Sequence, residues 1–440
     1  MTILLTNGRI IDPYMNWDFI GDVLITGNNI TKIGTVNTYP NDTHIFDASN
    51  MVISPGFIDL HCHLREPGEE NKETIATGTL AAAIGGFTTI CAMPNTIPPI
   101  DNPTIIKQSI QQYQEKAIIN VMPIACVTEN RSGSILTDMY GLARNGAIGF
   151  SDDGNPVQSD TLMRNALIAS SAIGLPVINH CEDSLLSNGG VMNKGQLSDS
   201  LGLKGWTSLA EEKMVKRDLD LTESVGGFLH LAHISTSGSV DLIKKAKEKG
   251  IKVTAEATPH HLTITEDLTK LYDGQRITIN NMAKVNPPLR TYDDVQSVAQ
   301  GLSNGVIDCI ATDHAPHSER DKHGDFNDSA FGISGLETAL ASLLKLVHNN
   351  VLDINTLLHR LTVGPYEVIK NTGIKKPTLS PGSIADLTIF DPYYNWIVQP
   401  DKFVSKGKNT PLDGASMKGK VVMTLVNGKI VFDSREGQND

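Results

Sequence analysis

The stretch from about residue 52 to residue 375 alternates short apolar runs with longer amphipathic runs, and this alternation constrains the fold more than any other feature. The apolar runs have the length of strands, and the amphipathic runs have the spacing of helices. We predict strands at 86–94, 119–127, 146–152, 175–183, 228–235, 252–261 and 306–316, and helices at 104–117, 161–174, 239–250 and 336–350. Alternation repeated about eight times predicts an α/β fold, a TIM-like (β/α)8 barrel of parallel strands.

The two ends of the chain share a different pattern. Residues 1–50 and the C-terminal stretch both contain strand-like runs separated by turn signals such as Asn-Gly. Two β segments that flank a barrel favour one small composite β-sandwich domain built from both termini. We therefore predict an N-terminal part at 1–52, a barrel at 53–375 and a C-terminal part at 376–440.

Polar residues that can bind a metal follow the predicted strands. The residues at these strand ends are His61 and His63, Asn95, Asp152 and Asp153, His180, His233, His260 and His261, and Asp313 and His314. Barrel enzymes carry their chemistry at the carboxyl ends of the strands. The pattern therefore predicts an active site at that end of the barrel.

The segment "FIDLHCHLREPG", residues 57–68, contains the clearest of these signals. In an extended strand His61, His63 and Arg65 point to one face, and Cys62 points to the other. Two imidazoles at this spacing can share a metal ion, but histidines at strand ends are as often structural. The recurrence of histidines and aspartates at other strand ends favours the metal.

Four histidines and two carboxylates exceed what one tetrahedral zinc site needs. Nitrogen and oxygen ligands without thiolates suit zinc or a similar ion at an open, catalytic site. We therefore expect two metal ions with a bridging carboxylate, and a hydroxide between them as the nucleophile. The five scattered cysteines lie mostly in apolar runs and are expected to be buried free thiols.

The charge of the chain limits its partners. Thirty-seven basic against forty-nine acidic residues give a net charge of −12, which argues against nucleic acid and anionic membranes. The N-terminus lacks the basic and apolar regions of a signal peptide, and no apolar run is long enough to span a membrane. We expect a cytoplasmic protein with a small-molecule substrate.

A series of motifs resembles the dihydroorotases of the long bacterial type, in the amidohydrolase superfamily. The motifs are "GFIDLHCHLREPG", "TTICAMPNTIPP", "GFSDDG", "INHCED", "LAHISTSGSV", "EATPHHL", "KVNPPLR", "ATDHAPH" and "FGISGLETAL". The resemblance implies a metal-bearing barrel with a composite β domain. It also implies zinc-dependent interconversion of (S)-dihydroorotate and N-carbamoyl-L-aspartate in pyrimidine biosynthesis.

The resemblance also implies metal ligands. His61 and His63 match the ligands of a first zinc, and His180 and His233 those of a second. Asp153 matches the bridging carboxylate, with the adjacent Asp152 as the alternative. Asp313 matches the last ligand and the proton shuttle. Many relatives bridge the metals with a carbamylated lysine, but "GAIGFSDDG" contains no lysine, which favours the aspartate.

Further positions match substrate contacts. Arg65, Asn95 and His317 match residues that hold the carboxylate of dihydroorotate, to which a planar guanidinium is well suited. Three others match positions around the pyrimidine ring: Asn286, Phe331 and Gly332.

Some interpretations remain open. Allantoinase, hydantoinase and dihydropyrimidinase are alternative activities, and Arg65 argues against the last two. A hypothesis of another functional class is that this chain is a non-catalytic, dihydroorotase-like partner of aspartate transcarbamoylase. A homodimer and association with that transcarbamoylase are possible assemblies. Residues 318–328 form either a solvated loop or a lid. We interpret His260, His261, His314 and Cys181 as structural.

Overall fold

Strands from both ends of the chain meet in one eight-stranded sheet, within residues 1–272 and 277–435, which the computed structural model describes. β5 from the N-terminal segment pairs antiparallel with β17 from the C-terminal segment. The strands of this sheet are β1 (Thr2–Asp12), β2 (Trp17–Thr26), β3 (Asn29–Gly34), β4 (His44–Asp47), β5 (Val52–Pro55), β17 (Leu387–Ile397), β18 (Ser416–Val426) and β19 (Lys429–Asp433). The predicted composite β domain is therefore confirmed, while its exact boundaries stay a prediction.

The core of this sheet is also composite. Ile10, Val23 and Ile53 from the N-terminal strands pack in one buried apolar cluster with Leu387 and Met423 from the C-terminal strands. Neither terminal segment alone could bury these side chains, so hydrophobic burial holds the two ends of the chain together.

The central part of the chain forms a ring of parallel strands. These are β6 (Phe57–Cys62), β7 (Phe87–Ala92), β8 (Asn120–Pro123), β9 (Val177–Asn179), β12 (Leu229–Leu231), β13 (Val253–Ala257) and β16 (Cys309–Ile310). They pair in two runs, β6-β7-β8 and β16-β13-β12-β9. Parallel bridges of Phe150 to Ala125 and Val177 join the runs on one side, and a bridge between Cys62 and His314 joins them on the other. The predicted barrel is thus closed.

Six of the seven predicted strands are present but shorter than predicted, and two of the predictions also differ from the structure in local conformation. Residues 146–152 contribute only the bridges at Phe150, and Gly146, where the strand was predicted to begin, has a φ of 107°, which an extended strand does not adopt. The strand predicted at 252–261 ends at Ala257, and helix α9 (Pro259–Thr263) follows. Thr258 caps that helix with its side-chain oxygen, which accepts from the His261 N–H.

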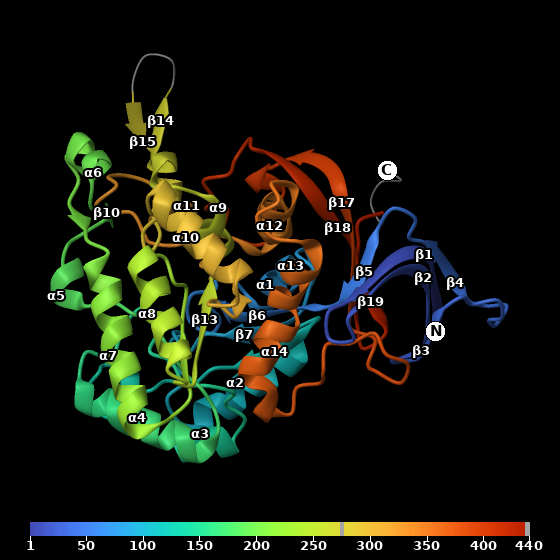
Figure 1. Cartoon of the computed structure of the whole chain (residues 1–440), viewed down its shortest axis with the longest axis horizontal. Helices are drawn as coiled ribbons and strands as arrows, with labels where there is room; N and C mark the ends of the chain where they lie inside the picture. Colours follow the sequence, from blue (N-terminus) through green and yellow to red (C-terminus); the bar gives the residue numbers. More distant parts are fainter. Residues whose placement is uncertain (273–276, 436–440) are drawn as a thin grey trace.

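Helices cover the outside of the barrel (Figure 1). The longer ones are α1 (Ile75–Ile84), α2 (Pro103–Lys116), α3 (Met139–Arg144), α4 (Asp160–Ile173), α7 (Leu209–Val225), α8 (Ser237–Glu248), α10 (Tyr292–Ser303), α12 (Ala339–His348), α13 (Ile354–Leu361) and α14 (Val363–Ile369). The four predicted helices correspond to α2, α4, α8 and α12; the other six, α1, α3, α7, α10, α13 and α14, were not predicted. In the described residues, every helix is too short or too polar to cross a membrane.

Short elements lie in the connections that follow the barrel strands. They are α5 (Ser184–Ser187), β10 (Met192–Asn193), α6 (Gln196–Leu201), β11 (Gly205–Trp206), β14 (Lys270–Tyr272), β15 (Ile277–Ile279) and α11 (Glu319–Lys322). Short 3-10 helices accompany them: η1 (Glu129–Arg131), η2 (Glu266–Thr269), η3 (Asn281–Ala283), η4 (Leu336–Thr338), η5 (Lys370–Thr372) and η6 (Pro400–Lys402). Figure 1 shows the β14–β15 hairpin projecting from the same end of the molecule as α6 and β10.

The sheet is fastened to the start of the barrel. The Phe57 ring of β6 lies 5.8 Å from the Phe87 ring of β7 and 6.2 Å from the Phe390 ring of β17. The Thr388 hydroxyl of β17 donates to the Gly86 carbonyl at 2.5 Å. These contacts fix the beginning of β6, the strand whose other end carries the first histidine pair.

Candidate metal centre

Four histidines converge on the carboxylate of Asp153. Its oxygens lie 3.4 Å from His61 Nε2, 3.5 Å from His63 Nε2, 3.4 Å from His180 Nδ1 and 3.6 Å from His233 Nε2. All five side chains are buried. The ends of β6, β9 and β12 and the loop after Phe150 supply them, as expected where parallel strands end together.

Asp313 adds a second carboxylate to the same cluster. Its Oδ1 lies 3.1 Å from His63 Nε2 and 3.6 Å from His61 Nε2. Asp313 follows β16 and has a φ of 44°. A non-glycine residue in this region is strained, which is common where a side chain must be aimed at a functional site.

The donor set fits a divalent cation. Two overlapping groups, His61 with His63 and Asp313, and His61 with Asp153 and His233, each bring their ligand atoms within 4.8 Å of one another. His61 Nε2 and Asp153 Oδ1 are buried and have no hydrogen-bond partner among the described residues. Such buried polar atoms are costly unless a ligand satisfies them.

The pKa shifts within the cluster also indicate a site for a cation. Burial opposes charge on His180, but Asp153 and Glu182 outweigh it and raise the pKa of His180 to about 10. Burial likewise opposes ionisation of Asp153, but His61 and the other histidines hold its pKa well below the usual range. The carboxylates therefore attract positive charge to this point, which a metal ion would supply.

Other side chains orient the histidines from behind. Glu256 Oε1 lies 2.9 Å from His61 Nδ1, and Glu182 Oε2 lies 2.9 Å from His180 Nε2. Neither glutamate was predicted as a functional residue, although Glu256 belongs to the motif "EATPHHL" and Glu182 to "INHCED". Adjacency to a ligand motif was the available signal.

Of the two adjacent aspartates, Asp153 faces the histidines and Asp152 does not. Asp152 is buried and accepts from the backbone N–H groups of Val127 and Thr128 at 2.9 and 3.1 Å, and from the Thr128 hydroxyl. It thereby fixes the loop that carries Asp153. Arg131, which the sequence did not indicate, donates to the main-chain carbonyl of Asp153.

Arg65 reaches the site from outside the strand. β6 ends at Cys62, and Arg65 has a φ of 59°, so strand alternation does not set its direction as we expected. Its Nε donates to the Pro316 carbonyl at 3.2 Å, and its Nη2 lies 3.4 Å from His317 Nε2. The guanidinium is buried, and Glu69 Oε2 lies 3.9 Å from its Nη1. Contacts with the segment after β16 therefore aim this side chain.

The other predicted substrate contacts divide into two groups. His317 Nε2 donates to the Phe331 carbonyl at 2.8 Å, which brings Arg65, His317, Phe331 and Gly332 together. Gly332 has a φ of 146°, and a Cβ there would lie 2.6 Å from the Ala315 carbonyl oxygen, so this position requires glycine.

The amides Asn95 and Asn286 instead contact groups around the metal centre. Asn95 Oδ1 accepts from His63 Nδ1 at 2.9 Å, and Asn286 Nδ2 donates to Glu182 Oε2 at 2.8 Å. Each asparagine therefore has one side-chain atom engaged in orienting the cluster, directly or through Glu182.

Two buried lysines anchor the segment 318–332. Lys284 Nζ donates to the carbonyls of Phe326 and Asn327 at 2.7 and 3.0 Å. Lys322 Nζ donates to the carbonyls of Lys284 and Ala330 at 2.9 and 2.8 Å. This segment includes α11 and Phe331. The role of its residues 318–328 as a lid stays a prediction.

The histidines and the cysteine that we interpreted as structural have protein partners. His261 is bonded to Thr258 and to the Pro287 carbonyl, and His314 to Glu73 and the Gly335 N–H; Cys181 Sγ contacts Asn179 and Asp218. His260 differs, because its Nε2 is buried without a hydrogen-bond partner among the described residues. Burial lowers the pKa of His260 to about 4, so its ring is neutral.

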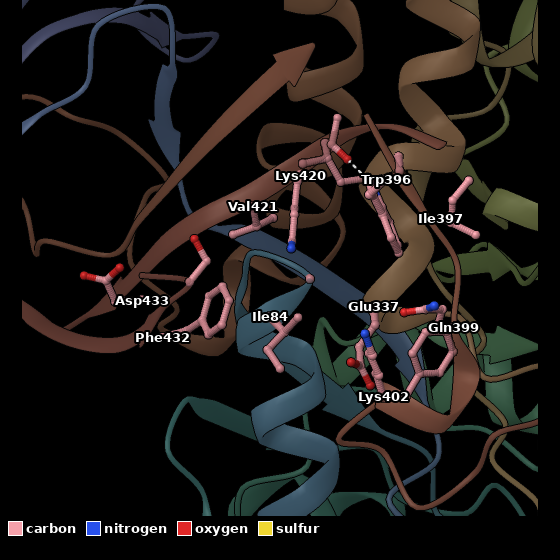
Figure 2. Close-up of a pocket in the computed structure, with 16 residues that line it drawn as sticks. Ile84, Glu337, Trp396, Ile397, Gln399, Lys402, Lys420, Val421, Phe432 and Asp433 are labelled. Carbon is pink, nitrogen blue, oxygen red and sulfur yellow. Dashed lines mark hydrogen bonds between the residues drawn. The ribbon is translucent and has the colours of Figure 1, made fainter. Parts of the chain in front are cut away.

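A cavity of about 480 Å³ lies away from this cluster, between the sheet and the barrel helices (Figure 2). Trp396, Lys402 and Lys420 from the C-terminal segment line it together with Ile84 and Glu337 from the barrel. None of the six candidate metal ligands lines this cavity, so it is separate from the metal cluster.

The sequence of this chain is similar to those of known proteins. A family described as "Dihydro-orotase-like" matches residues 50–239. A dihydroorotase of Syntrophus aciditrophicus is 46% identical over 98% of this chain and 99% of its own length. A dihydroorotase of Geobacter metallireducens is 42% identical over 98% of this chain and all of its own length.

Solved structures of related folds also match. An L-hydantoinase from Arthrobacter aurescens has a TM-score of 0.86 at 24% identity, covering 98% of this chain and 96% of its own. A dihydropyrimidinase from Brevibacillus agri has a TM-score of 0.81 at 23% identity, covering 98% and 95%. At such low identity these structures establish the fold alone.

Proposed function

This chain belongs to the dihydroorotase family, and from that membership we propose that it is a zinc enzyme that interconverts (S)-dihydroorotate and N-carbamoyl-L-aspartate in pyrimidine biosynthesis. Its likeness to curated dihydroorotases extends over nearly the whole chain, which supports this reaction over those of other cyclic amide hydrolases. The observation that carries the metal dependence is the convergence of four histidines on Asp153.

We assign two zinc ions to the cluster. The proposed ligands are His61 and His63 for one ion, His180 and His233 for the other, Asp153 between them, and Asp313 as the last ligand. All six offer nitrogen or oxygen, which suits zinc at a catalytic site. When bound, such ions polarise the ring carbonyl and activate the attacking water.

Asp313 is the proposed proton carrier. Hydrolysis of the ring amide adds water to the carbonyl carbon, breaks the carbon–nitrogen bond, and requires a proton to move from the water to the departing nitrogen. The Asp313 carboxylate belongs to the cluster and lies beside His63 and His61, where it can hold that proton in transit.

Arg65 is the proposed anchor of the substrate carboxylate. Its guanidinium is buried at the edge of the site, and its Nε donates to the Pro316 carbonyl. Its Nη1 and Nη2 make only long contacts, 3.9 Å to Glu69 and 3.4 Å to His317, so these two groups can still bind a carboxylate. His317, Asn95 and Asn286 are assigned to the same substrate. Phe331 and Gly332 would contact the pyrimidine ring. Hydantoin and dihydropyrimidine rings lack this carboxylate, so Arg65 favours dihydroorotate.

Metal analysis combined with a dihydroorotate assay tests the proposal. We expect close to two zinc ions per chain and reversible turnover. In Arg65→Met, turnover should be abolished while the metal content stays normal, whereas Arg164→Met, at a half-buried position on α4 where the arginine donates to the Ser224 hydroxyl, should change neither. Less than one metal per chain with no turnover after zinc reconstitution would overturn the enzyme assignment. Loss of metal in Arg65→Met would overturn its role toward the substrate.

Our proposal also covers the oligomeric state, the protein partner and the cellular location of the enzyme. We propose a cytoplasmic enzyme that forms a homodimer and can associate with aspartate transcarbamoylase. Light scattering of the purified chain, alone and mixed with the transcarbamoylase, measures both assemblies. A monomer that does not shift in mass on mixing would contradict them.

A further inference from the structure

A chain of buried hydrogen bonds leads from the metal centre into the barrel wall. Glu256 Oε1 lies 2.9 Å from His61 Nδ1, and Glu256 Oε2 lies 3.0 Å from His230 Nε2. His230 Nδ1 in turn lies 2.8 Å from the Thr254 hydroxyl. The side chains of His61, His230 and Glu256 are completely inaccessible to solvent.

The strand register builds this chain into the sheet. His230 of β12 is the direct partner of Thr254 in β13. Glu256 lies two residues beyond Thr254 and therefore points to the same side of the strand. Every member comes from a strand and none from a loop, so the barrel holds the relay rigidly.

The hydrogen bonds also determine which nitrogens carry protons. An ionised carboxylate only accepts, so the proton of His61 is on Nδ1 and that of His230 is on Nε2. The Thr254 hydroxyl then donates to His230 Nδ1. With its proton on Nδ1, His61 keeps the lone pair of Nε2, its buried and unpartnered atom, for a cation that would also contact the nearby carboxylates of Asp153 and Asp313.

We propose that Glu256 is a positioning residue that fixes the tautomer and orientation of His61, and that His230 acts through Glu256 by holding its second oxygen. The inference rests on the metal centre proposed above. Carboxylates behind metal-binding histidines typically strengthen metal binding by 10- to 100-fold. Glu256 also adds a negative charge just outside a centre that would hold two dications.

The variant Glu256→Gln removes the negative charge of Glu256 and keeps nearly the same side-chain volume, so no cavity forms. The glutamine oxygen can still accept from His61 Nδ1. Its amide can donate to His230 Nε2 once the His230 proton moves to Nδ1, where the Thr254 hydroxyl can accept it. Each polar group thus keeps a partner, and we expect the metal-free variant to fold with a thermal midpoint close to that of the wild type.

The measured quantity is metal affinity, from competition between the protein and a chelator for Zn²⁺. We expect a loss of about 10- to 100-fold in Glu256→Gln, and a changed absorption spectrum of the Co²⁺-substituted protein. Glu337→Gln is the matched control, because Glu337 is also a largely buried carboxyl that accepts two backbone N–H bonds, from Val404 and Ser405, but it lies beside the separate cavity.

A second variant tests the role of His230. His230→Gln should weaken metal binding in the wild-type background and have little further effect in the Glu256→Gln background, because it acts only through Glu256. A wild type that binds metal tightly, with affinity and Co²⁺ spectrum unchanged in Glu256→Gln, would overturn this inference alone. Additive effects of the two substitutions would overturn the role of His230. A wild type that binds no metal would overturn the proposed function as well.

Discussion

Substitution of Lys322 by methionine should remove a pH dependence from the anchoring of segment 318–332. Lys322 is 1% exposed. Burial, with a smaller contribution from Lys284, lowers its pKa from 10.5 to about 7. Its two hydrogen bonds go to carbonyls, and a neutral amine still has two N–H groups for them. The anchored segment therefore tolerates the neutral form better than the charged one.

The direction of the pH dependence follows from the number of protons that the open and closed forms bind. When the segment opens, Lys322 is hydrated and recovers a pKa near 10.5, so above pH 7 the open form binds more protons than the closed form. The free energy of opening then rises with pH from about 7 to about 10.5 and is flat below that window. Each pH unit contributes at most about 1.4 kcal/mol, a tenfold change in the opening equilibrium.

Hydrogen–deuterium exchange of peptides from 318–332 measures this equilibrium, because the protection factor corrects for the intrinsic rate at each pH. Between pH 7 and pH 8, we expect protection to rise about fivefold in the wild type from Lys322 alone. Lys284, whose pKa burial lowers to about 8, contributes at most about twofold over this interval. The rise should shrink to that smaller contribution in Lys322→Met and persist in Lys249→Met, an exposed lysine. Equal protection at both pH values in the wild type would refute the reasoning.

Three further predictions concern the site. Gly332→Ala should raise KM for dihydroorotate and destabilise the fold by about 1–3 kcal/mol, because its φ is 146° and a Cβ would lie 2.6 Å from the Ala315 carbonyl oxygen; wild-type kinetics and melting would contradict this. Cys181→Ala should keep the wild-type metal content by elemental analysis, because its thiol contacts Asn179 and Asp218; loss of metal would make it a ligand. Removal of metal by a chelator should lower the thermal midpoint, since Asp153 would lose its cation; an unchanged midpoint would count against the centre.

The local pattern of the sequence was enough to predict the architecture. Strand-helix alternation admits few topologies, and the right-handed parallel crossover brings every strand end to one rim. For this reason His61, His180 and Asp313, which are far apart in the chain, could be expected at one site before any contact was known.

The sequence was less informative where glycine or a capping residue overrides an apolar run. The predicted strand at 146–152 is reduced to bridges at Phe150, and Gly146 at its predicted start is not extended. The helix α7 is one of six longer helices that were not predicted. Its charged residues obscure the apolar spacing, although Met214, Val215 and Leu219 are buried.

Only the tertiary structure decided how the side chains of this site are aimed. Local pattern does not distinguish the adjacent Asp152 and Asp153, and only the family resemblance favoured Asp153. In the structure, the N–H groups of Val127 and Thr128 hold Asp152 away from the histidines. Arg65 takes its direction from the Pro316 carbonyl, 251 residues along the chain.

Glu256 is hydrogen-bonded to His61, although the two residues are 195 positions apart in the sequence. Spacing along one strand determines which side of that strand a residue occupies, because backbone geometry repeats every two residues. Which partner lies opposite depends on the packing and register of other strands, and no local pattern contains that information. The sequence by itself determined the barrel, its composite β domain and the rim that carries the histidines, whereas the orientation of those histidines was decided by contacts between distant segments.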